Sequence, residues 1–443
     1  MQVSGRWTEL RLLIPLVLLV PLGFALANIV ATHKPDPGPM VIAIAYVGLV
    51  LAAHLALVLL GHRGDQLLLP LAATIGGVGL VMLNRLPQGL AGMNLFGAQI
   101  VMAETQLIWF GISLTAMVAI AVFFRDDVLL RHYKYTWAVA GAALMVVTFL
   151  FGNEVNGARL WLSIGPVTFQ PGEAIKIVLV VFIAGYLAEN RALLAGAHRS
   201  IGFLKIPPLP YLLPMLAMFA IVMAIVVVSK DLGTALLFFG IFLTMLFVAT
   251  GRRSYVLIGL VLFLAGSWVA YELFPHVRVR VDDWLNPWAD PTGNGYQTVQ
   301  ALYAFGRGGL FGEGLGQGLP LISGHIPIPA IETDFIFTAI AEELGLVGAF
   351  ALLAFAAALV FRGLRTAILA HDDFSSLLAV GLTTSLGLQT LIIVAGNAKL
   401  IPLTGITFPF VSYGGSSLLA SFVVIGLLLS ISHRTAVTAG DAP

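Results

Sequence analysis

The chain has 443 residues, of which 59% are hydrophobic and only 10% charged. A soluble protein carries roughly a quarter charged residues, so this composition excludes both a soluble globular domain and a disordered chain. The net charge of +1 leaves no basic tail or stripe for nucleic acid, and the lack of cysteine excludes disulfides, thiolate nucleophiles and cysteine-bound metals. The fold class that remains is an all-α polytopic membrane protein.

Twelve segments come close to the roughly 20 mainly apolar residues that a bilayer-spanning helix needs. They are 10–30, 40–60, 66–83, 105–124, 134–151, 173–188, 210–228, 233–250, 254–273, 335–361, 375–395 and 409–431. The first contains Ala25-Leu26-Ala27, which resembles a signal-peptidase site, but its length and the spans that follow favour a retained helix. The third carries Gly76, Gly77 and Gly79, which suggests close helix packing.

The distribution of Lys and Arg predicts the orientation. When the N-terminus is placed inside and the segments alternate, the inner side carries more basic residues than the outer side. The positive-inside rule then places both termini in the cytoplasm.

Two outer segments, 152–172 and 274–334, are expected to hold the chemistry. The second is too long for a connector, and loops of that length usually carry function or a small structure of their own. It has no counterpart elsewhere in the chain, which disfavours a symmetric transporter.

The first motif joins N-G-A-R-L-W at 156–161 to Q-P-G-E-A-I-K at 170–176. Pro171 suits the first turn of a helix, Glu173 favours its positive end, and Lys176 lies on the same face. One interpretation is a capped helix start with a local ion pair. The other is that Lys176, inside an apolar run, faces a cavity and binds phosphate together with Arg159.

The second motif is the tight turn S-K-D-L-G-T at 229–234. The side chain of Asp231 can cap the helix that follows. A cap needs no cation, so Lys230 is a candidate for binding an anion. Lys399, before the packed segment P-F-V-S-Y-G-G-S-S at 409–417, is a further outer cation.

The third motif lies in the long segment 274–334. Arg278 and Arg280 alternate with valine, tryptophans suited to the membrane interface follow, and Asp290-Pro291 precedes two glycines. Asp290 alone would be a turn former. Beside aromatic rings and arginines, it also resembles a site for a sugar and a phosphate.

The fourth motif combines a glycine-rich stretch with two acidic residues inside an apolar span. The stretch 305–318 matches no nucleotide-binding loop, and its glycines permit tight turns or close approach to a ligand. Glu342 and Glu343 lie within the next apolar span and should face the protein interior. They would either bond helices together or line a polar cavity.

Taken in order, NGARLW, QPGEAIK, KDLGTA, DPTGNGYQ, FGRGGLFGEGLG, TDFIF with EELG, and PLTG with PFVSYGGSS resemble the SEDS (shape, elongation, division, sporulation) family, which includes RodA and FtsW. The resemblance covers roughly residues 66–431 and implies a ten-helix membrane core with one large extracytoplasmic loop, 274–334. Residues 1–65 would then be an additional pair of helices, and 432–443 a short cytoplasmic tail. The chain departs from the family at Ser229-Lys230, and at Ala330 and Glu332, which replace the Glu and His of P-E-x-H-T-D-F.

The resemblance implies a peptidoglycan glycosyltransferase that polymerises lipid II at the outer face of the bacterial cytoplasmic membrane, in elongation or division. It implies a class B penicillin-binding transpeptidase as partner, among other elongasome or divisome proteins. The family's essential loop aspartate maps onto Asp290, which we expect to be the general base. The expected substrate-binding residues, with basic side chains for the leaving undecaprenyl diphosphate, are Arg159, Glu173, Lys176, Lys230, Arg278, Arg280, Gln297 and Lys399.

Three points stay open at this stage. A divalent cation, Mg²⁺ or Mn²⁺, could share the neutralisation of the diphosphate, although the sequence identifies no ligands for it. The protein could instead be a flippase that moves lipid II without chemistry. It could also be a non-catalytic scaffold that recruits a transpeptidase.

Overall fold

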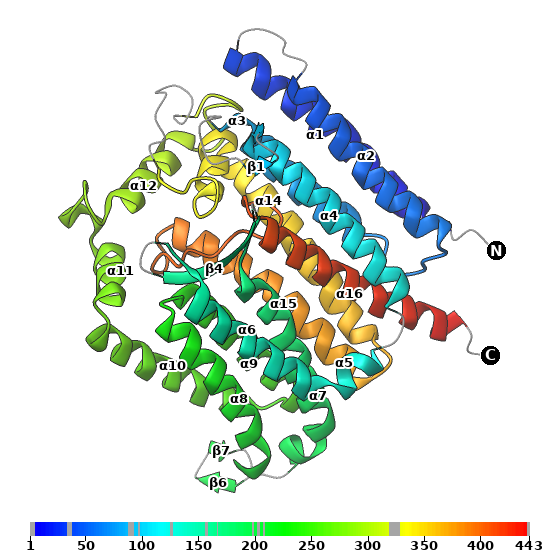
Figure 1. Ribbon diagram of the computed structural model, residues 1–443, viewed down its shortest axis with the longest axis vertical. Helices are drawn as coiled ribbons and strands as arrows, with labels where there is room; N and C mark the ends of the chain where they lie inside the picture. Colours follow the sequence, from blue (N-terminus) through cyan, green and yellow to red (C-terminus); the bar gives the residue numbers. More distant parts are fainter. Residues whose placement is uncertain are drawn as a thin grey trace. The chain divides into compact units, whose positions relative to one another are not determined.

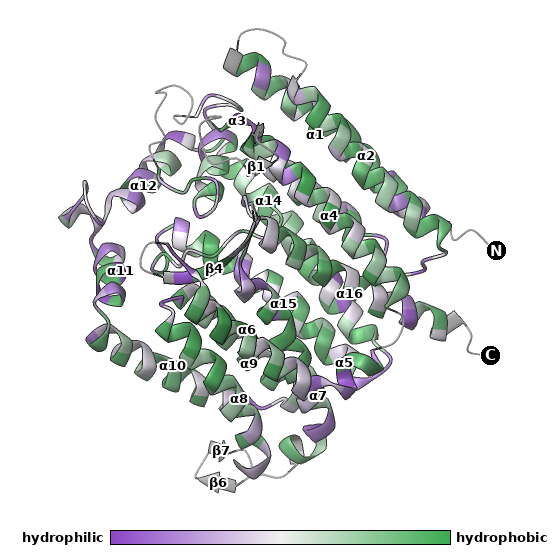
Figure 2. Cartoon of the chain, in the orientation of Figure 1, coloured by the Kyte–Doolittle hydropathy of each residue, from purple (hydrophilic) through white to green (hydrophobic). Residues whose placement is uncertain are grey.

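The computed structural model describes residues 5–32, 38–86, 93–95, 98–124, 127–155, 158–165, 167–196, 199–201, 204–206, 209–318 and 328–440. Twelve helices within these residues are long and apolar enough to cross a membrane. They are α1 (Trp7–Thr32), α2 (Gly38–Leu59), α3 (Leu68–Arg85), α4 (Met102–Phe123), α6 (Lys134–Phe151), α7 (Pro171–Gly196), α8 (Leu209–Val228), α9 (Leu232–Thr250), α10 (Arg253–Leu273), α14 (Ile336–Leu369), α15 (Asp373–Asn397) and α16 (Gly415–Gly440) (Figure 1). Hydrophobic residues dominate these helices (Figure 2), so the chain is a multi-pass membrane protein.

Shorter elements connect the spans. The helical ones are α5 (Val128–His132), α11 (Pro275–Leu285), the 3₁₀ turn η1 (Pro287–Ala289) and α12 (Tyr296–Gly308). The strands are β1 (Met93–Leu95), β2 (Ala98–Ile100), β3 (Asn153–Val155), β4 (Ala158–Ile164), β5 (Val167–Phe169), β6 (Arg199–Ile201) and β7 (Leu204–Ile206). All are antiparallel: β1 pairs with β2, β6 with β7, and β4 lies between β3 and β5.

The chain divides into two compact units. The first comprises residues 1–125, 282–362 and 389–443. In it α1 packs against α2 and α3, α2 against α4, and α4 against α16 (Figure 1). Helix α3 is closely enclosed, because its glycines allow close approach. A methyl group built at Gly76 would lie 2.6 Å from the Phe110 ring, and one at Gly77 would lie 2.7 Å from Val20.

The second unit comprises residues 126–281 and 363–388. Helix α7 packs against α6, α8 and α9, and α9 also packs against α10. Both ends of α9 follow from the sequence. The side chain of Asp231 accepts a hydrogen bond from the Thr234 N–H at 3.0 Å, and Gly251 ends the helix in the left-handed conformation with φ 67°.

The segment 274–334 contains a small structure of its own, as its length suggested: α11, η1 and α12 occupy much of it, and residues 319–327 lie outside the described part. Several helix ends differ from the expected ones. Helix α14 runs to Leu369 rather than 361, and it is broken at Gly345, whose φ of 66° and ψ of −172° are not helical. The expected tail at 432–443 continues α16 as far as Gly440, and the last span begins at Gly415 rather than 409 because the residues before it form a turn.

Candidate active site

The second unit holds a polar pocket at the Pro171 end of α7. Arg159 on β4 lines it together with Gln170, Ser229 and Asp231. The Arg159 side chain is half exposed and lies 3.4 Å from a carboxylate oxygen of Glu154 across the β3–β4 pair. An exposed ion pair at that distance contributes little to the free energy of folding, so the guanidinium can exchange this partner for an anion. Two residues of its motif, 156 and 157, lie outside the described residues.

Glu173 and Lys176 form a buried ion pair. The Lys176 ammonium lies 2.6 Å from a Glu173 carboxylate oxygen, and only 1% of the lysine side chain is exposed. The local ion pair anticipated from their spacing is therefore present. Because Lys176 is enclosed and its charge is balanced, this structure does not place it where it could meet a phosphate directly.

The turn between α8 and α9 presents one charge to solvent and shields another. Lys230 is exposed in the left-handed conformation, with φ 62°. Burial raises the pKa of Asp231, the nearby Glu173 adds to the rise, and Arg280 opposes it. Asp231 is a helix cap, as its position predicted, and it also belongs to the electrostatic group at the pocket.

Arg278 and Arg280 do not act together. They lie on a helix, where residues two apart point to different sides. Arg278 pairs with Glu272 at 3.6 Å and lies over the Tyr271 ring. Arg280 instead influences Asp231 and His276. The second unit thus gathers Arg159, Lys230 and Arg280 around Asp231 and Glu173, and leaves Arg278 out.

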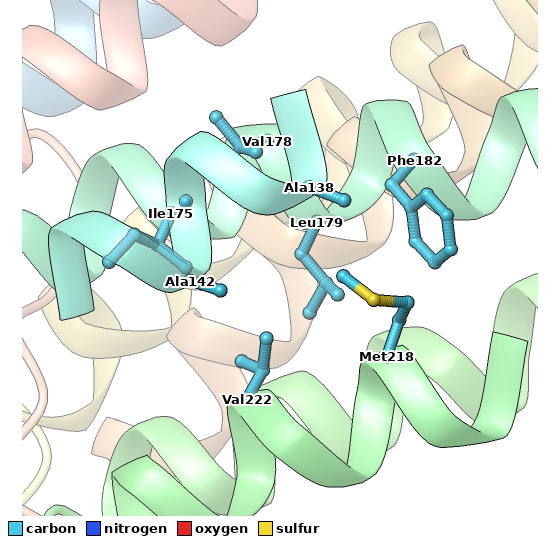
Figure 3. A pocket seen from close by; sticks show the side chains of 9 residues that line it. Ala138, Ala142, Ile175, Val178, Leu179, Phe182, Met218 and Val222 are labelled. Atoms are coloured by element: carbon cyan, nitrogen blue, oxygen red, sulfur yellow. The ribbon is translucent and has the colours of Figure 1, made fainter. Parts of the chain in front are cut away.

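An apolar pocket adjoins the polar one. It lies between α6, α7 and α8, and Ile175 lines both pockets. Figure 3 shows Ala138 and Ala142 of α6, Leu179 of α7 and Val222 of α8 around this space. Along α7 the lining therefore changes from mixed polar and apolar near Gln170 to wholly apolar beyond Ile175.

Asp290 lies in the first unit, where its carboxylate organises a turn. One oxygen accepts the Gly293 N–H and the other the Asn294 N–H, each at 3.0 Å. A methyl group built at Gly293 would lie 2.1 Å from a carboxylate oxygen, so the glycine is required for this contact. The turn-forming role predicted for Asp290 is confirmed. The residue is also exposed, and each carboxylate oxygen keeps a lone pair for another donor.

Acidic and aromatic neighbours precede this turn. Burial raises the pKa of Asp283, and the charges of Asp290 and Asp282 raise it further. Trp284 donates its indole N–H to the Lys399 carbonyl oxygen at 3.1 Å. Lys399 is therefore linked to this end of α11 through its backbone, which has a left-handed φ of 58°. Gln297, at the start of α12, donates to the Pro329 carbonyl oxygen at 3.3 Å.

The two buried glutamates of α14 hold the glycine-rich segment. Glu342 pairs with Arg307 of α12 at 3.0 Å. Glu343 pairs with Arg85 of α3 and accepts the N–H groups of Gly316 at 3.0 Å and Gly318 at 3.3 Å. Both side chains face the protein interior, as predicted, and they bond elements together.

Sequence reasoning missed some of these residues. Arg85 lies on the outer side in the predicted orientation, but it is 4% exposed at the end of α3. Arg6 lies on the inner side in that orientation, but it is 3% exposed and pairs with Glu9. The spacing of Arg6 and Glu9 by three could have indicated a helical ion pair. Nothing near Arg85 in the sequence points to Glu343.

The described residues contain no group of three His, Asp or Glu side chains that could hold a metal ion. Of the nine predicted site residues, the structure gathers four in the second unit: Arg159, Glu173, Lys230 and Arg280. Lys176 is buried beside Glu173. In the first unit it places Asp290, Gln297 and Lys399.

Comparisons with known proteins extend these observations. The family model for FtsW, RodA and SpoVE cell cycle proteins matches residues 65–437. The peptidoglycan glycosyltransferase RodA of Mycobacterium bovis is 42% identical over 393 residues, which cover 88% of this chain and 82% of the relative. Stage V sporulation protein E of Bacillus subtilis is 35% identical over 379 residues, covering 83% and 97%.

Solved structures show the same fold. A structure describing the coordination of polymerization and crosslinking by a peptidoglycan synthase complex matches with a TM-score of 0.66 and 27% identity, covering 84% of this chain and 98% of that one. The crystal structure of Thermus thermophilus RodA matches with a TM-score of 0.58 and 26% identity, covering 84% and 97%.

Proposed function

The chain belongs to the FtsW, RodA and SpoVE family and is a peptidoglycan glycosyltransferase; we propose that it polymerises lipid II with Asp290 as its general base. The observation that carries the assignment of Asp290 is its geometry. Two backbone N–H groups fix the carboxylate while it stays exposed to an incoming hydroxyl. A base held in this way needs no rearrangement before it accepts a proton.

In the proposed reaction the 4-hydroxyl oxygen of the acceptor sugar forms a bond to C1 of the donor sugar. The bond between C1 and the diphosphate oxygen breaks, and undecaprenyl diphosphate leaves as an anion. The hydroxyl proton passes to Asp290. Charge builds on the leaving group during this step, so fixed cations near it stabilise the transition state.

We assign that stabilisation to Arg159, Lys230 and Arg280. The first makes a long, exposed contact with Glu154, and the second is exposed on a tight turn. The buried Glu173–Lys176 pair is assigned a supporting role, because its charges are already matched. Arg278, which is engaged by Glu272, and Lys399 are assigned secondary roles in binding the diphosphate.

We further propose that the first isoprene units of the lipid lie against the apolar residues of α6, α7 and α8 that line this pocket (Figure 3). Ile175 lines both pockets, so a lipid chain that follows its head group would pass from polar to apolar surroundings along α7. The substrate then need not leave the bilayer for the reaction to occur.

A divalent cation remains part of the proposal as a companion of the diphosphate. Diphosphate oxygens would supply ligands for it. The cation would add positive charge where the leaving group forms.

We propose that the protein acts at the outer face of the bacterial cytoplasmic membrane with both termini inside. Its proposed partners are a class B penicillin-binding transpeptidase and other membrane proteins of elongation or division. The solved synthase complex supports a crosslinking partner, because that complex coordinates polymerization with crosslinking.

The proposal is tested by incubating purified protein and its partner with labelled lipid II and separating the products by size. We expect glycan chains from the wild type. We expect at least a 100-fold lower rate from Asp290→Asn, because a general base contributes about 10²–10⁴-fold. Asp282→Asn, an exposed change in the same segment, is the matched control and should retain activity.

Two results would contradict the proposal. If folded Asp290→Asn made normal glycan, Asp290 would not be the base. If the wild type moved labelled lipid II across vesicles without making glycan, the protein would be a transporter.

A further inference from the structure

The helices α1 and α2 precede residue 65, where the family match begins, and the proposed mechanism gives them no task. Their contacts within the first unit are more specific than a lipid-facing addition requires. A buried ionic network fixes one end of α1, and the other end touches the glycine-rich segment that Glu343 holds.

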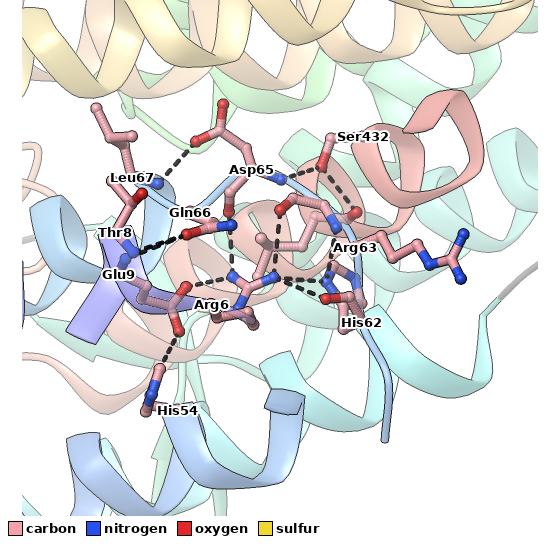
Figure 4. A network of polar contacts seen from close by, with 12 residues as sticks. Arg6, Thr8, Glu9, His54, His62, Arg63, Asp65, Gln66, Leu67 and Ser432 are labelled. Carbon is pink, nitrogen blue, oxygen red and sulfur yellow. Dashed lines mark hydrogen bonds and ion pairs between the residues drawn. The ribbon is translucent and has the colours of Figure 1, made fainter. Parts of the chain in front are cut away.

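The network lies at the start of α1 (Figure 4). Glu9 is fully buried and pairs with both Arg6 and His54. Arg6 also donates to the carbonyl oxygens of His62, Gly64 and Asp65 at 3.1–3.2 Å. These bonds tie α1 to the connection that leads into α3.

A second set of contacts ties that connection to the rest of the unit. Gln66 accepts the N–H groups of Thr8 and Glu9, which satisfies two donors of the first turn of α1. Asp65 pairs with Arg362 of α14, and its N–H is bonded to Ser432 of α16 at 2.9 Å. The position of α1 along its axis is therefore fixed relative to three core helices. If α1 slid along its axis, the buried pairs would separate and leave uncompensated charges, so this movement is strongly opposed.

The middle of the hairpin follows α3 closely. Buried residues of α1 recur at helical spacing, at Leu13, Leu16, Val20, Phe24 and Ala27. A methyl group built at Gly23 would lie 3.3 Å from Val81 of α3, and the Tyr46 hydroxyl of α2 donates to the Ala73 carbonyl oxygen at 2.5 Å. The hairpin and α3 thus form one packed element.

The C-terminal end of α1 packs closely against Gly316. A methyl group built at this glycine would lie 3.1 Å from the Ala27 carbonyl oxygen and 3.3 Å from the Val30 side chain. The Gly316 N–H is bonded to Glu343, whose other oxygen meets Arg85 at the end of α3. Gly316 therefore lies between α1 and the Glu343–Arg85 pair.

The glycine-rich segment in turn continues α12, which begins directly after the Asp290 turn. The Gly312 and Glu313 N–H groups bond to Gly308 of α12 and Glu342 of α14 at 2.7 and 3.0 Å. A shift of 309–318 would therefore move α12 and the turn that carries Asp290.

We propose that the α1–α2 hairpin is a positioning element of the active site. Its buried ionic network fixes the position of α1 along its axis. At the other end of α1, Ala27 and Val30 hold the segment 309–318 in place. The hairpin touches no substrate in this arrangement. It acts on the reaction through the placement of Asp290, and to that extent the inference rests on the proposed function.

The test compares Val30→Ala with Ile29→Ala. The second is a matched control, because Ile29 is 50% exposed on the outer face of the same helix turn. Amide hydrogen exchange of 309–318 and lipid II polymerisation are measured for the full chain with its partner. We expect Val30→Ala to raise exchange at Gly316 and Gly318 at least 5-fold and to lower kcat several-fold, with KM for lipid II and the unfolding temperature nearly unchanged. Ile29→Ala should match the wild type in both measurements.

The inference is wrong if Val30→Ala leaves exchange and kcat at wild-type values, or if both variants change them equally. If Val30→Ala folds poorly, Val30→Thr replaces it, because threonine keeps the branched shape of valine and places a hydroxyl beside Gly316. Exchange at 309–318 should again rise and kcat should again fall; wild-type values of both would overturn the inference. Exchange does not depend on activity, so failure of the proposed function would be recognised separately as wild-type protein that makes no glycan.

Discussion

The pair of Glu173 and Lys176 at the start of α7 is shielded from solvent, and this decides how mutations there must be interpreted. Lys176→Met leaves a buried carboxylate without its ammonium, which costs about 3–5 kcal/mol when a buried pair is broken. Loss of activity in that variant would therefore report misfolding as much as catalysis. A function for the lysine can be isolated only when the glutamate is neutralised as well.

We therefore expect Glu173→Gln/Lys176→Met to unfold at a temperature close to that of the wild type, well above either single variant. Thermal unfolding in detergent checks this. If Lys176 supports the donor site, the double variant should still polymerise more slowly at limiting lipid II. Wild-type turnover under those conditions would remove Lys176 from the site.

Asp231 gives a prediction about pH. Its pKa in the folded protein is raised from the ordinary value of 3.8, mainly by burial, so the folded state binds the proton more tightly than the unfolded state. Stability is then lost as pH rises from 3.8 through the raised value, and the loss is complete above it. Asp231→Asn removes this loss and keeps an oxygen to accept the Thr234 N–H.

At pH 7, Asp231→Asn should therefore be at least as stable as the wild type, and any advantage should vanish below pH 4. Thermal unfolding across this range provides the measurement. Asp231→Ala is the control for the helix cap and should be less stable than Asp231→Asn by about 1 kcal/mol at every pH, because neither variant titrates at this position. If Asp231→Asn were less stable than the wild type at pH 7 but equally stable below pH 4, the ionised carboxylate would be shown to stabilise the fold.

Among the elements, the break in α14 could not be foreseen from apolar content. The spans were predictable because long apolar runs have few alternatives in a membrane, and their helices are present. Glycine within E-E-L-G, however, is compatible with a continuous helix. The break becomes necessary only because another segment docks there: Leu346 and Val347 donate to the Gly309 and Leu310 carbonyl oxygens at 3.0 and 3.1 Å.

Gly345→Ala tests this docking. The φ of 66° and ψ of −172° are almost confined to glycine, and a methyl group there would lie 2.4 Å from the Gly312 nitrogen and the Leu310 oxygen. We expect a loss of at least about 2 kcal/mol in unfolding free energy together with loss of polymerisation.

Gly306→Ala is the matched control, because Gly306 is helical in α12 and a methyl group there would meet no atom within 4 Å. It should be neutral or more stable by about 0.5–1 kcal/mol. Equal effects of the two substitutions would show that the break in α14 has no special role.

For the whole molecule, the sequence was most informative where a motif is local and least where partners are distant in the chain. The turn of Asp290, the cap of Asp231 and the pair of Glu173 with Lys176 each depend on residues within four positions. The pairs Arg85–Glu343 and Arg362–Asp65 join residues hundreds of positions apart. Several basic residues that enter the positive-inside rule for the predicted orientation are therefore bound inside the protein.

That orientation can be measured because the chain contains no cysteine, so one introduced thiol is the only site for a maleimide reagent. Thr168 on β5 and Arg63 before α3 are both exposed. If the basic connections face the cytoplasm, Thr168→Cys should react with a membrane-impermeant maleimide in intact cells, and Arg63→Cys only after permeabilisation. Ala73→Cys, at a fully buried position of α3, should react in neither case. The reverse pattern would place Arg159 and the pocket it lines on the cytoplasmic side, where a polymerase acting at the outer face could not use them.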